Sequence, residues 1–303
     1  MTKIIQTKDF LLSQTLECGQ CFHFNKIAEE EYLISAKGKL LHASQEGNNL
    51  ILHNIEDTDA DMWLRYFDLD RDYAAIKDML LTTDKLLAPS IEAMWGVRIL
   101  RQDFFETLIS FIISQNQQIP RIKQIVANLS KAAGTELADG MYAFPTAEAI
   151  LELGVDGVRE CKAGFRSPYI IDACEKYVSG VISEQALRDM SYEECIETLK
   201  QIKGVGDKVA NCVALFALEK RSAFPIDVWI KRIMESIYFK KETPIKDIAK
   251  LASERFGEYG GYAQQYLFYY GRELAVGEKV SKIEKKERKQ EKIRENIMKN
   301  ILA

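Results

Sequence analysis

Between residues 30 and 54, apolar and polar residues alternate in short steps. The runs YLISA, KLLHAS and NLILHNI are separated by Lys-Gly and by Gly-Asn-Asn. Alternation with a period of two indicates strands, and the glycine-containing steps between them indicate tight turns. The segment LECGQCFHF just before them carries a glycine in a short turn that leads into an aromatic strand. The pattern therefore predicts an antiparallel meander near the N-terminus.

Beyond about residue 58 the apolar residues recur at three- and four-residue steps, which is the period of an amphipathic helix. Segments of this kind are DYAAIKDMLL, QDFFETLISFIIS, RIKQIVANLSKAA and YEECIETLKQI. This order predicts an α+β fold in which two parts pack together. The first is a small N-terminal antiparallel β domain, residues 1–95. The second is a large all-α region, residues 96–303, that contains a helix-hairpin-helix and ends in a basic C-terminal helix.

The helix-hairpin-helix is predicted where the helical segment 191–201 runs into IKGVG and the helical pattern resumes over residues 207–218. Gly204 and Gly206 suit a turn that needs positive φ and close approach. Such a turn leaves backbone N–H groups at the start of the second helix free to bind a phosphate without any side-chain charge. The alternative is a plain turn between two helices, and the Gly-Val-Gly sequence alone does not decide between them.

Lys208 follows these glycines and interrupts the apolar pattern. It shares a helix face with Cys212 and Leu215, so its amine is directed toward an apolar surface. Asp227 lies two residues after Pro225, where a further helix is predicted to begin, and it is either a helix cap or a carboxylate held in a cleft. An amine kept neutral by desolvation can attack the anomeric carbon of a sugar, and a fixed carboxylate can stabilise the positive charge that develops there.

The overall charge speaks weakly against a nucleic-acid partner. The chain has 303 residues, 47% hydrophobic and 28% charged, with a formal net charge of −4. The distribution is uneven, because residues 278–303 hold nine Lys or Arg against five Glu. We interpret this tail as a solvated helix or frayed end with i,i+4 pairs, the alternative being a DNA-binding arm. Contact with DNA elsewhere would need a local basic surface or exposed backbone amides.

Several classes of protein are disfavoured by what the sequence lacks. No apolar run approaches the roughly 18 residues that span a bilayer, and MTKIIQTKDF lacks the apolar stretch of a signal peptide. We therefore expect an intracellular protein without a membrane partner, cytoplasmic in a prokaryote or nuclear in a eukaryote.

The six cysteines are scattered, which suits a reducing compartment. Cys18 and Cys21 form a C-x-x-C, but no second one completes a zinc site and only three histidines are available. We interpret the pair as loop thiols and predict no metal and no cofactor.

The stretch GVGDKVANCVALFALEKRSAFPIDVWI resembles the helix-hairpin-helix and Gly/Pro…Asp segment of the HhH-GPD superfamily of DNA glycosylases. Within it, the chain resembles the 8-oxoguanine DNA glycosylase/AP lyase branch. Other segments have counterparts in that branch, so the resemblance covers nearly the whole chain: LECGQCFHF, YFDLDRDY, GVRILRQDFFETLISFIISQNQQIPRI, GFRSPYI and YGGYAQQYLFYY.

The resemblance implies roles in catalysis and base recognition. Lys208 would be the nucleophile that forms a Schiff base, and Asp227 its electrostatic partner. The Gly19 carbonyl would accept a hydrogen bond from N7 of 8-oxoguanine, which is protonated, whereas N7 of guanine is an acceptor. Gln264 would read the Watson–Crick edge of the flipped base. Phe268 and Cys212 would sandwich its ring, and the Lys208–Cys212 pair would present a charge dipole to it.

The resemblance also implies a DNA surface around the flipped nucleotide. Asn116 would fill the gap left in the duplex, Phe165 would wedge the base stack, and Arg121 and Arg166 would contact the orphaned cytosine. Taken singly, these residues suit ordinary structural roles: core aromatic, surface arginine or capped turn. The implied partner is double-stranded DNA with 8-oxoguanine opposite cytosine, bound by a monomer.

Three alternative readings are weighed against this one. The endonuclease III-like branch carries a four-cysteine iron–sulfur cluster near the C-terminus, and no cysteine follows Cys212 here. Glycosylases for other damaged bases, such as alkylated ones, share the aspartate but usually lack the lysine, so Lys208 is the discriminating residue. A non-catalytic helix-hairpin-helix DNA-binding protein would leave Asp227, Gly19 and Gln264 without a role.

Overall fold

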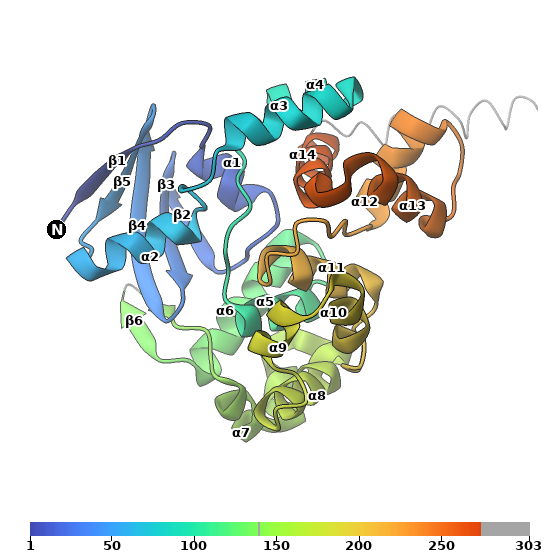
Figure 1. Ribbon diagram of the computed structural model, residues 1–303. Helices are drawn as coiled ribbons and strands as arrows, with labels where there is room; N and C mark the ends of the chain where they lie inside the picture. Colours follow the sequence, from blue (N-terminus) through green and yellow to red (C-terminus); the bar gives the residue numbers. More distant parts are fainter. Residues whose placement is uncertain (139, 274–303) are drawn as a thin grey trace, which may run out of the picture.

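The computed structural model describes residues 1–138 and 140–273 of the chain (Figure 1). The basic C-terminal helix expected from the sequence lies outside the described residues. The α+β prediction is confirmed, because an antiparallel sheet comes first and a mostly helical region follows. Within the described part of the chain, no helix has the length and apolar character needed to cross a membrane.

The N-terminal sheet has five antiparallel strands in the order β1-β5-β4-β3-β2. The strands are β1 (Lys3–Gln6), β2 (Phe24–Ala28), β3 (Glu31–Ala36), β4 (Lys39–Glu46) and β5 (Asn49–His53). The Lys-Gly step forms a two-residue hairpin turn, in which Lys37 and Gly38 both have positive φ, 53° and 72°, and Ala36 pairs with Lys39. The predicted meander is therefore present, and β1 extends it beside β5.

Helices α1 (Leu12–Glu17) and α2 (Ala60–Tyr66) cover the sheet and close its own hydrophobic core. Alternate residues of the strands point into this core, as the period of two requires. Tyr32 of β3, Leu41 of β4 and Trp63 of α2 are all buried there. The Gly19 turn leaves this layer directly after α1, so the sheet fixes where that turn lies.

The remaining helices form a second, larger core, which begins before residue 95. They are α3 (Tyr73–Thr83), α4 (Ala88–Ala93), α5 (Phe104–Ile113), α6 (Ile119–Ala133), α7 (Ala147–Val158), α8 (Ser167–Val178), α9 (Glu184–Asp189), α10 (Tyr192–Leu199), α11 (Asp207–Phe216), α12 (Val228–Met234), α13 (Ile245–Phe256) and α14 (Gly260–Glu273). A hairpin, β6 (Glu136–Ala138) and β7 (Met141–Tyr142), interrupts the region that was expected to be all-helical.

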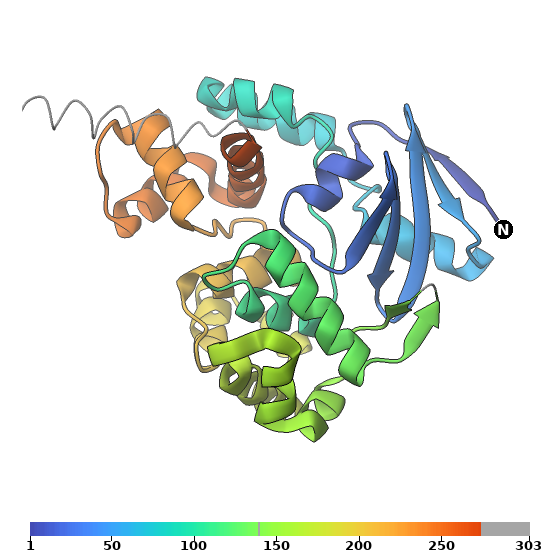
Figure 2. The ribbon, with the colours of Figure 1, turned by 180° about the vertical axis from the view of Figure 1, so that it is seen from behind.

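Figures 1 and 2 both show α4 beside α14, so an early helix of this core and its last described helix are neighbours. Ile91 of α4 and Tyr262 of α14 are buried in the same hydrophobic cluster. The division of the chain at residue 95 stays a prediction.

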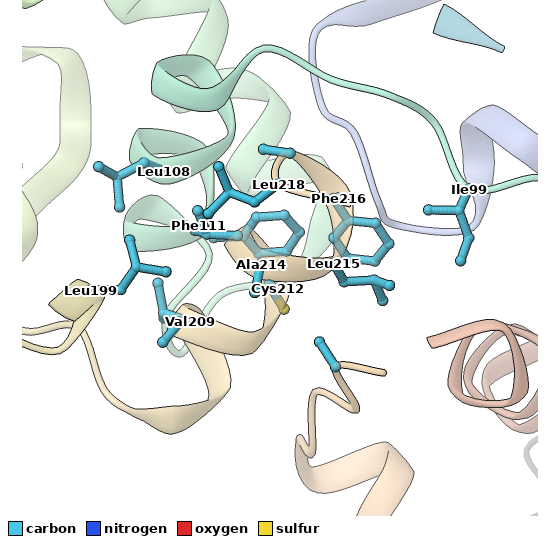
Figure 3. Packing of buried hydrophobic residues seen from close by; sticks show 14 of the residues in the cluster. Ile99, Leu108, Phe111, Leu199, Val209, Cys212, Ala214, Leu215, Phe216 and Leu218 are labelled. Atoms are coloured by element: carbon cyan, nitrogen blue, oxygen red, sulfur yellow. The ribbon is translucent and has the colours of Figure 1, made fainter. Parts of the chain in front are cut away.

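The centre of the helical core is the packing of α5 against α11 (Figure 3). Phe111 and Phe216 stack with ring centroids 5.5 Å apart and planes 12° apart. Cys212 and Leu215 are buried in the same cluster. This apolar contact sets the position of the α11 N-terminus, which carries Lys208, relative to the C-terminal end of α5.

Candidate active site

A pocket of about 1090 Å³ lies where five segments meet. The segments are the Gly19 turn, the 114–120 turn between α5 and α6, the first turn of α11, residues 226–229 at the start of α12, and α14. These segments are distant in sequence and are brought together by the helical core. The pocket is therefore a product of the tertiary fold.

The Lys208 amine enters this pocket from the first turn of α11. Its Nζ donates a hydrogen bond to Ser114 Oγ at 3.1 Å and lies 5.0 Å from the centre of the Phe111 ring. Ser114 Oγ in turn donates to the Phe111 carbonyl oxygen at 2.8 Å. Because that bond uses the hydroxyl proton, Ser114 offers Lys208 a lone pair in a fixed direction. The contact holds the amine over the pocket.

Asp227 faces the same pocket and caps α12. Its Oδ1 accepts a hydrogen bond from the Ile230 amide at 2.8 Å, which is the N-cap geometry that the sequence suggested. Burial raises the pKa of this carboxyl above its usual range, against the opposite effects of the Ile230 amide and the Lys208 charge. The cap and the cleft readings of Asp227 therefore both hold: the carboxylate is fixed by the helix and lines the pocket.

Cys212 lies one turn beyond Lys208 and is buried behind the pocket wall. Burial raises the pKa of the Cys212 thiol to about 11, although the Lys208 charge acts in the opposite direction. The group is therefore a neutral thiol near pH 7. The charge dipole that the resemblance implies for the Lys208–Cys212 pair stays a prediction, which would require this thiol to lose its proton.

Gly19 forms a tight turn that also lines the pocket, with φ +87°. A Cβ added there would lie 3.1 Å from Ile119 Cδ1 and 3.4 Å from Phe268 Cε1, so a side chain would crowd the pocket. The neighbouring Gln20 side chain anchors the turn. Its Nε2 donates to the Thr15 and Arg98 carbonyls at 2.8 and 2.7 Å, and its Oε1 accepts from the Leu100 amide at 2.9 Å.

Gln264 lies one helical turn before Phe268 on α14. Its Nε2 donates to the Pro225 carbonyl at 3.3 Å, while its Oε1 is buried without a hydrogen-bond partner among the described residues. Phe268 lines the pocket, whereas Gln264 does not. An unpaired buried acceptor is costly, so Gln264 Oε1 is a candidate to accept a hydrogen bond from a ligand.

The turn between α5 and α6 carries Asn116, which is exposed and has a left-handed φ of +52°. Arg166 holds this turn from behind. Its Nε donates to the Gln115 carbonyl at 2.9 Å and its Nη2 to the Asn116 carbonyl at 3.5 Å, and its side chain is only 3% exposed. Direct contact of Arg166 with a cytosine stays a prediction, which would require these bonds to be exchanged.

Phe165 and Arg121 are more accessible. Phe165 is 56% exposed, and the Arg166 guanidinium lies 4.2 Å from the centre of its ring. Arg121 Nη1 donates to Gln124 Oε1 at 2.5 Å on the surface of α6. An aromatic ring this exposed, backed by a buried arginine, suits insertion into a base stack.

The glycine hairpin differs from its prediction at one of its two glycines. Gly204 has φ +79°, and a Cβ there would lie 2.3 Å from Cδ2 of the Tyr169 ring. Gly206 has φ −107°, so the expected positive φ is wrong there. It is the N-cap of α11, no side chain caps the helix, and nothing lies within 4 Å of an added Cβ. Its lack of a side chain keeps the first amides of α11 open.

The comparisons with known proteins decide the family. Residues 3–108 match the model of the 8-oxoguanine DNA glycosylase N-terminal domain, and residues 109–258 match that of the HhH-GPD superfamily base excision DNA repair proteins. The solved structure of MBOgg1 in complex with a low-affinity DNA ligand is 42% identical, with a TM-score of 0.87, over 90% of this chain and 96% of that chain. The chain belongs to the 8-oxoguanine DNA glycosylase family.

Two further relatives support the membership. The Clostridium acetobutylicum 8-oxoguanine glycosylase/lyase, solved with double-stranded DNA containing cytosine opposite 8-oxoG, is 38% identical with a TM-score of 0.86, over 91% of this chain and 98% of that chain. The N-glycosylase/DNA lyase of Saccharomyces cerevisiae is 27% identical over 322 residues, 87% of this chain and 84% of the yeast protein. The family resemblance found in the sequence is thus confirmed.

The structure gathers part of the predicted glycosylase site in one pocket. The residues that line it are Gly19, Asn116, Lys208, Asp227 and Phe268. Two are buried without lining it, Cys212 and Gln264. The others lie outside the lining: Arg121, Phe165, Arg166, Gly204 and Gly206. Their roles stay predictions.

Sequence reasoning missed three residues of this site: Ser114, Gln20 and Arg272. The polar run SQNQQ marked the turn that contains Ser114, but its contact with Lys208 spans 94 residues. The sequence singled out the LECGQCFHF turn that contains Gln20, but it gave no sign that the Gln20 side chain anchors this turn. Arg272, in the last turn of α14, lines the pocket beside Phe268, and the sequence carried no local signal for it.

Proposed function

We propose that this protein is a DNA glycosylase/AP lyase that removes 8-oxoguanine from duplex DNA through a Schiff base on Lys208. The amine in its neutral form attacks C1′ of the flipped nucleotide, the base departs, and the resulting imine promotes β-elimination of the 3′ phosphate. The protein then leaves a cut strand at the lesion. This activity agrees with that of the family and with the names of the relatives that match it.

One observation carries the proposal: Lys208 Nζ and the Asp227 carboxylate line the same pocket. Asp227 is held by the α12 amide, so it needs no reorganisation when positive charge develops on the sugar. Ser114 and the Phe111 ring hold the amine on the apolar side. A nucleophile and a fixed anion thus meet where C1′ would lie.

Base recognition would take place where Gly19 and Phe268 line the pocket. Gly19 and the Phe268 ring edge border one narrow space, because a Cβ at Gly19 would lie 3.4 Å from Phe268 Cε1. A base stacked on Phe268 would present its N7 side to the Gly19 carbonyl. The proton on N7 of 8-oxoguanine satisfies the carbonyl, whereas the lone pair of guanine N7 is repelled by it.

The remaining predicted residues would hold the duplex. The open N-terminus of α11 suits a backbone phosphate, and the exposed Phe165 would wedge the base stack. Asn116 would fill the gap left by the flipped nucleotide, and Arg121 and Arg166 would contact the orphaned cytosine. As part of the proposal, the protein acts as a monomer on chromosomal DNA, in the cytoplasm of a prokaryote or the nucleus of a eukaryote.

Borohydride trapping tests the proposal directly. A duplex with 8-oxoguanine opposite cytosine is incubated with the protein in the presence of borohydride, which reduces a Schiff base to a stable covalent adduct. The wild-type protein and a Lys250→Gln control, altered at an exposed lysine of α13, are expected to give the adduct, and Lys208→Gln is expected to give none. An adduct with Lys208→Gln, or none with the wild type, would refute the assignment of Lys208.

A further inference from the structure

One helix holds three segments that would contact DNA in this glycosylase. Phe165 comes just before α8, and its exposed ring would wedge the base stack. Arg166 Nε donates to the Gln115 carbonyl at 2.9 Å, so the same end of α8 holds the turn that carries Asn116. The third segment is the glycine hairpin, residues 202–206, which packs on the first two turns of α8.

Tyr169 packs its ring on the backbone of the glycine hairpin. A Cβ added at Gly204 would lie 2.3 Å from Cδ2 and 2.6 Å from Cγ of this ring, so the ring takes the space that a side chain would need. One turn further along α8, Asp172 Oδ2 accepts a hydrogen bond from the Lys203 amide at 2.7 Å. The two exposed residues at the tip of the hairpin, Lys203 and Gly204, are therefore both attached to α8.

The Tyr169 ring is held in place by its surroundings. It meets the Phe165 ring edge to face, with centroids 6.2 Å apart and planes 78° apart. On the inner face of α8, Ile170 and Cys174 are fully buried in the helical core. α8 is therefore a fixed support, and the hairpin is the part that it positions.

The position of Gly204 matters because the chain reaches the N-cap of α11 two residues later. Gly206 leaves the first amides of α11 open, and in the proposed function these amides bind a backbone phosphate. A hydrogen bond depends on the distance and direction of its donor, so a displaced hairpin would lose the phosphate. The inner residues of the hairpin, Ile202 and Val205, are buried, which leaves its outer residues to α8.

We propose that Tyr169 is a positioning residue for DNA binding, which fixes the glycine hairpin on α8 so that the open amides of α11 meet a backbone phosphate. The inference rests on the proposed function. The ring carries the role, because the Tyr169 hydroxyl makes no hydrogen bond to any residue that the structure describes. The role concerns binding and not chemistry, since Tyr169 does not line the pocket and Lys208 is held separately by Ser114.

A double-variant cycle with Gly206→Asp tests this role. The aspartate repels a phosphate at the open amides of α11, so its penalty requires that the phosphate lies there. The Kd for a labelled duplex with 8-oxoguanine opposite cytosine is measured by fluorescence anisotropy. The proteins compared are Tyr169→Ala, Gly206→Asp and their combination, all in the Lys208→Gln background, which leaves the duplex uncut.

Tyr177→Ala, alone and with Gly206→Asp, is the matched control. Tyr177 is also a half-buried tyrosine of α8, but it lies in the last turn of that helix. Its ring stacks on Phe105 with centroids 4.9 Å apart. The control therefore removes a comparable aromatic contact without touching the glycine hairpin.

Tyr169→Ala is expected to raise the Kd about 10-fold, as for one lost hydrogen bond to a charged group. Gly206→Asp should then add less to the Kd than it does when Tyr169 is present. Tyr177→Ala should leave both the Kd and the Gly206→Asp penalty unchanged. An unchanged Kd in Tyr169→Ala, or an equal Gly206→Asp penalty with and without Tyr169, would overturn the role.

Two further measurements separate positioning from other roles of Tyr169. Tyr169→Phe should bind DNA as tightly as the parent protein, and weaker binding would assign the hydroxyl a direct DNA contact instead. With Lys208 restored, Tyr169→Ala should release 8-oxoguanine in single turnover at near the wild-type rate once the protein is saturating. A rate that falls at saturation as much as the affinity does would assign Tyr169 a structural role only.

Thermal unfolding shows whether each variant is folded at the assay temperature. If Tyr169→Ala is not, Tyr169→Leu takes its place in the cycle, because leucine fills part of the space but lacks the ring that covers Gly204. The same reduced Gly206→Asp penalty is expected, and a full penalty would overturn the role. Absence of DNA binding by the Lys208→Gln protein itself would refute the proposed function, and this inference with it.

Discussion

Helices α11 and α12 both begin beside the pocket, and they treat their free N-terminal amides in opposite ways. At α12 the Asp227 carboxylate accepts the Ile230 amide and occupies the helix end. At α11 the cap is Gly206, which has no side chain, and nothing lies within 4 Å of a Cβ added there. The N-terminus of α12 holds the protein's own Asp227 carboxylate in place. The N-terminus of α11 leaves its amide donors available to an anion from outside the protein.

The difference shows how one backbone feature can serve both halves of the proposed reaction. A carboxylate bound to a helix N-terminus is stabilised there, so it can remain in a half-buried pocket beside Lys208. The same dipole at α11, left uncapped, favours a phosphate. In the proposed reaction, the choice of aspartate or glycine at the N-cap position would thus decide which helix contributes to chemistry and which to DNA binding.

The largest expected effect comes from removing the charge at the α12 cap. Asp227→Asn retains a capping oxygen for the Ile230 amide but cannot stabilise positive charge on the sugar. Base release in single turnover should fall by at least about 10²-fold, while the affinity for the duplex stays near the wild-type value. A variant that excises at the wild-type rate would show that Asp227 is a structural cap alone.

The same variant carries a stability signature. Because burial raises the pKa of Asp227, the folded state binds more protons than the unfolded state between the usual and the raised value. Stability of the wild type therefore falls as pH rises through that window. Above that pH window, Asp227→Asn should unfold at a higher temperature than the wild type. This difference in unfolding temperature should shrink as the pH approaches 4. A difference that does not change with pH would show that burial does not raise the pKa of Asp227.

A smaller effect is expected from making the α11 cap resemble that of α12. Gly206→Asp fits the backbone, since φ is −107° and the Cβ meets open space. A carboxylate there would compete with a phosphate for the same amides, so the Kd for DNA should rise by roughly 10-fold or more at low salt. Gly206→Ser is the matched control, a neutral cap expected to bind DNA more tightly than the aspartate variant.

Salt sharpens the distinction between these two variants. The extra loss in Gly206→Asp is a repulsion between exposed charges, so the gap between aspartate and serine should narrow as ionic strength rises. Fluorescence anisotropy with a labelled duplex at several salt concentrations measures this gap. Equal binding by the two variants at low salt would place the phosphate elsewhere.

The local sequence pattern was sufficient to predict those features that depend on residues close together in the chain. The Asp227 cap and the turn at Gly204 follow from short-range chemistry, and the meander follows from a period of two. The positive φ predicted for Gly206 was wrong, because a glycine at an N-cap needs no left-handed backbone. At this position the glycine matters because it has no side chain to cover the first amides of α11.

Contacts across the fold could not be predicted in this way. Ser114 meets Lys208 across 94 residues, and Arg272 meets Glu17 across 255. Arg166 was expected to face DNA because its neighbours matched a family motif. That contact stays a prediction, and nothing in the sequence indicated that the Arg166 guanidinium bonds the carbonyls of Gln115 and Asn116, some 50 residues earlier. Packing decides such contacts, and no periodicity records them.

The smallest expected effect separates the two hairpin glycines by stability. Gly204→Ala meets both a φ of +79° and the Tyr169 ring at 2.3 Å, so the free energy of unfolding should fall by about 1–3 kcal/mol. Gly206→Ala meets neither and should unfold at the same denaturant concentration as the wild type. Urea titration followed by tryptophan fluorescence compares them.

The double variant Gly204→Ala, Tyr169→Ala removes the clash and leaves the backbone strain. Its free energy of unfolding should therefore fall by less than the sum of the losses in the two single variants. If both single glycine variants lost the same free energy of unfolding, the loss would come from altering the hairpin in general and not from the conformation at Gly204.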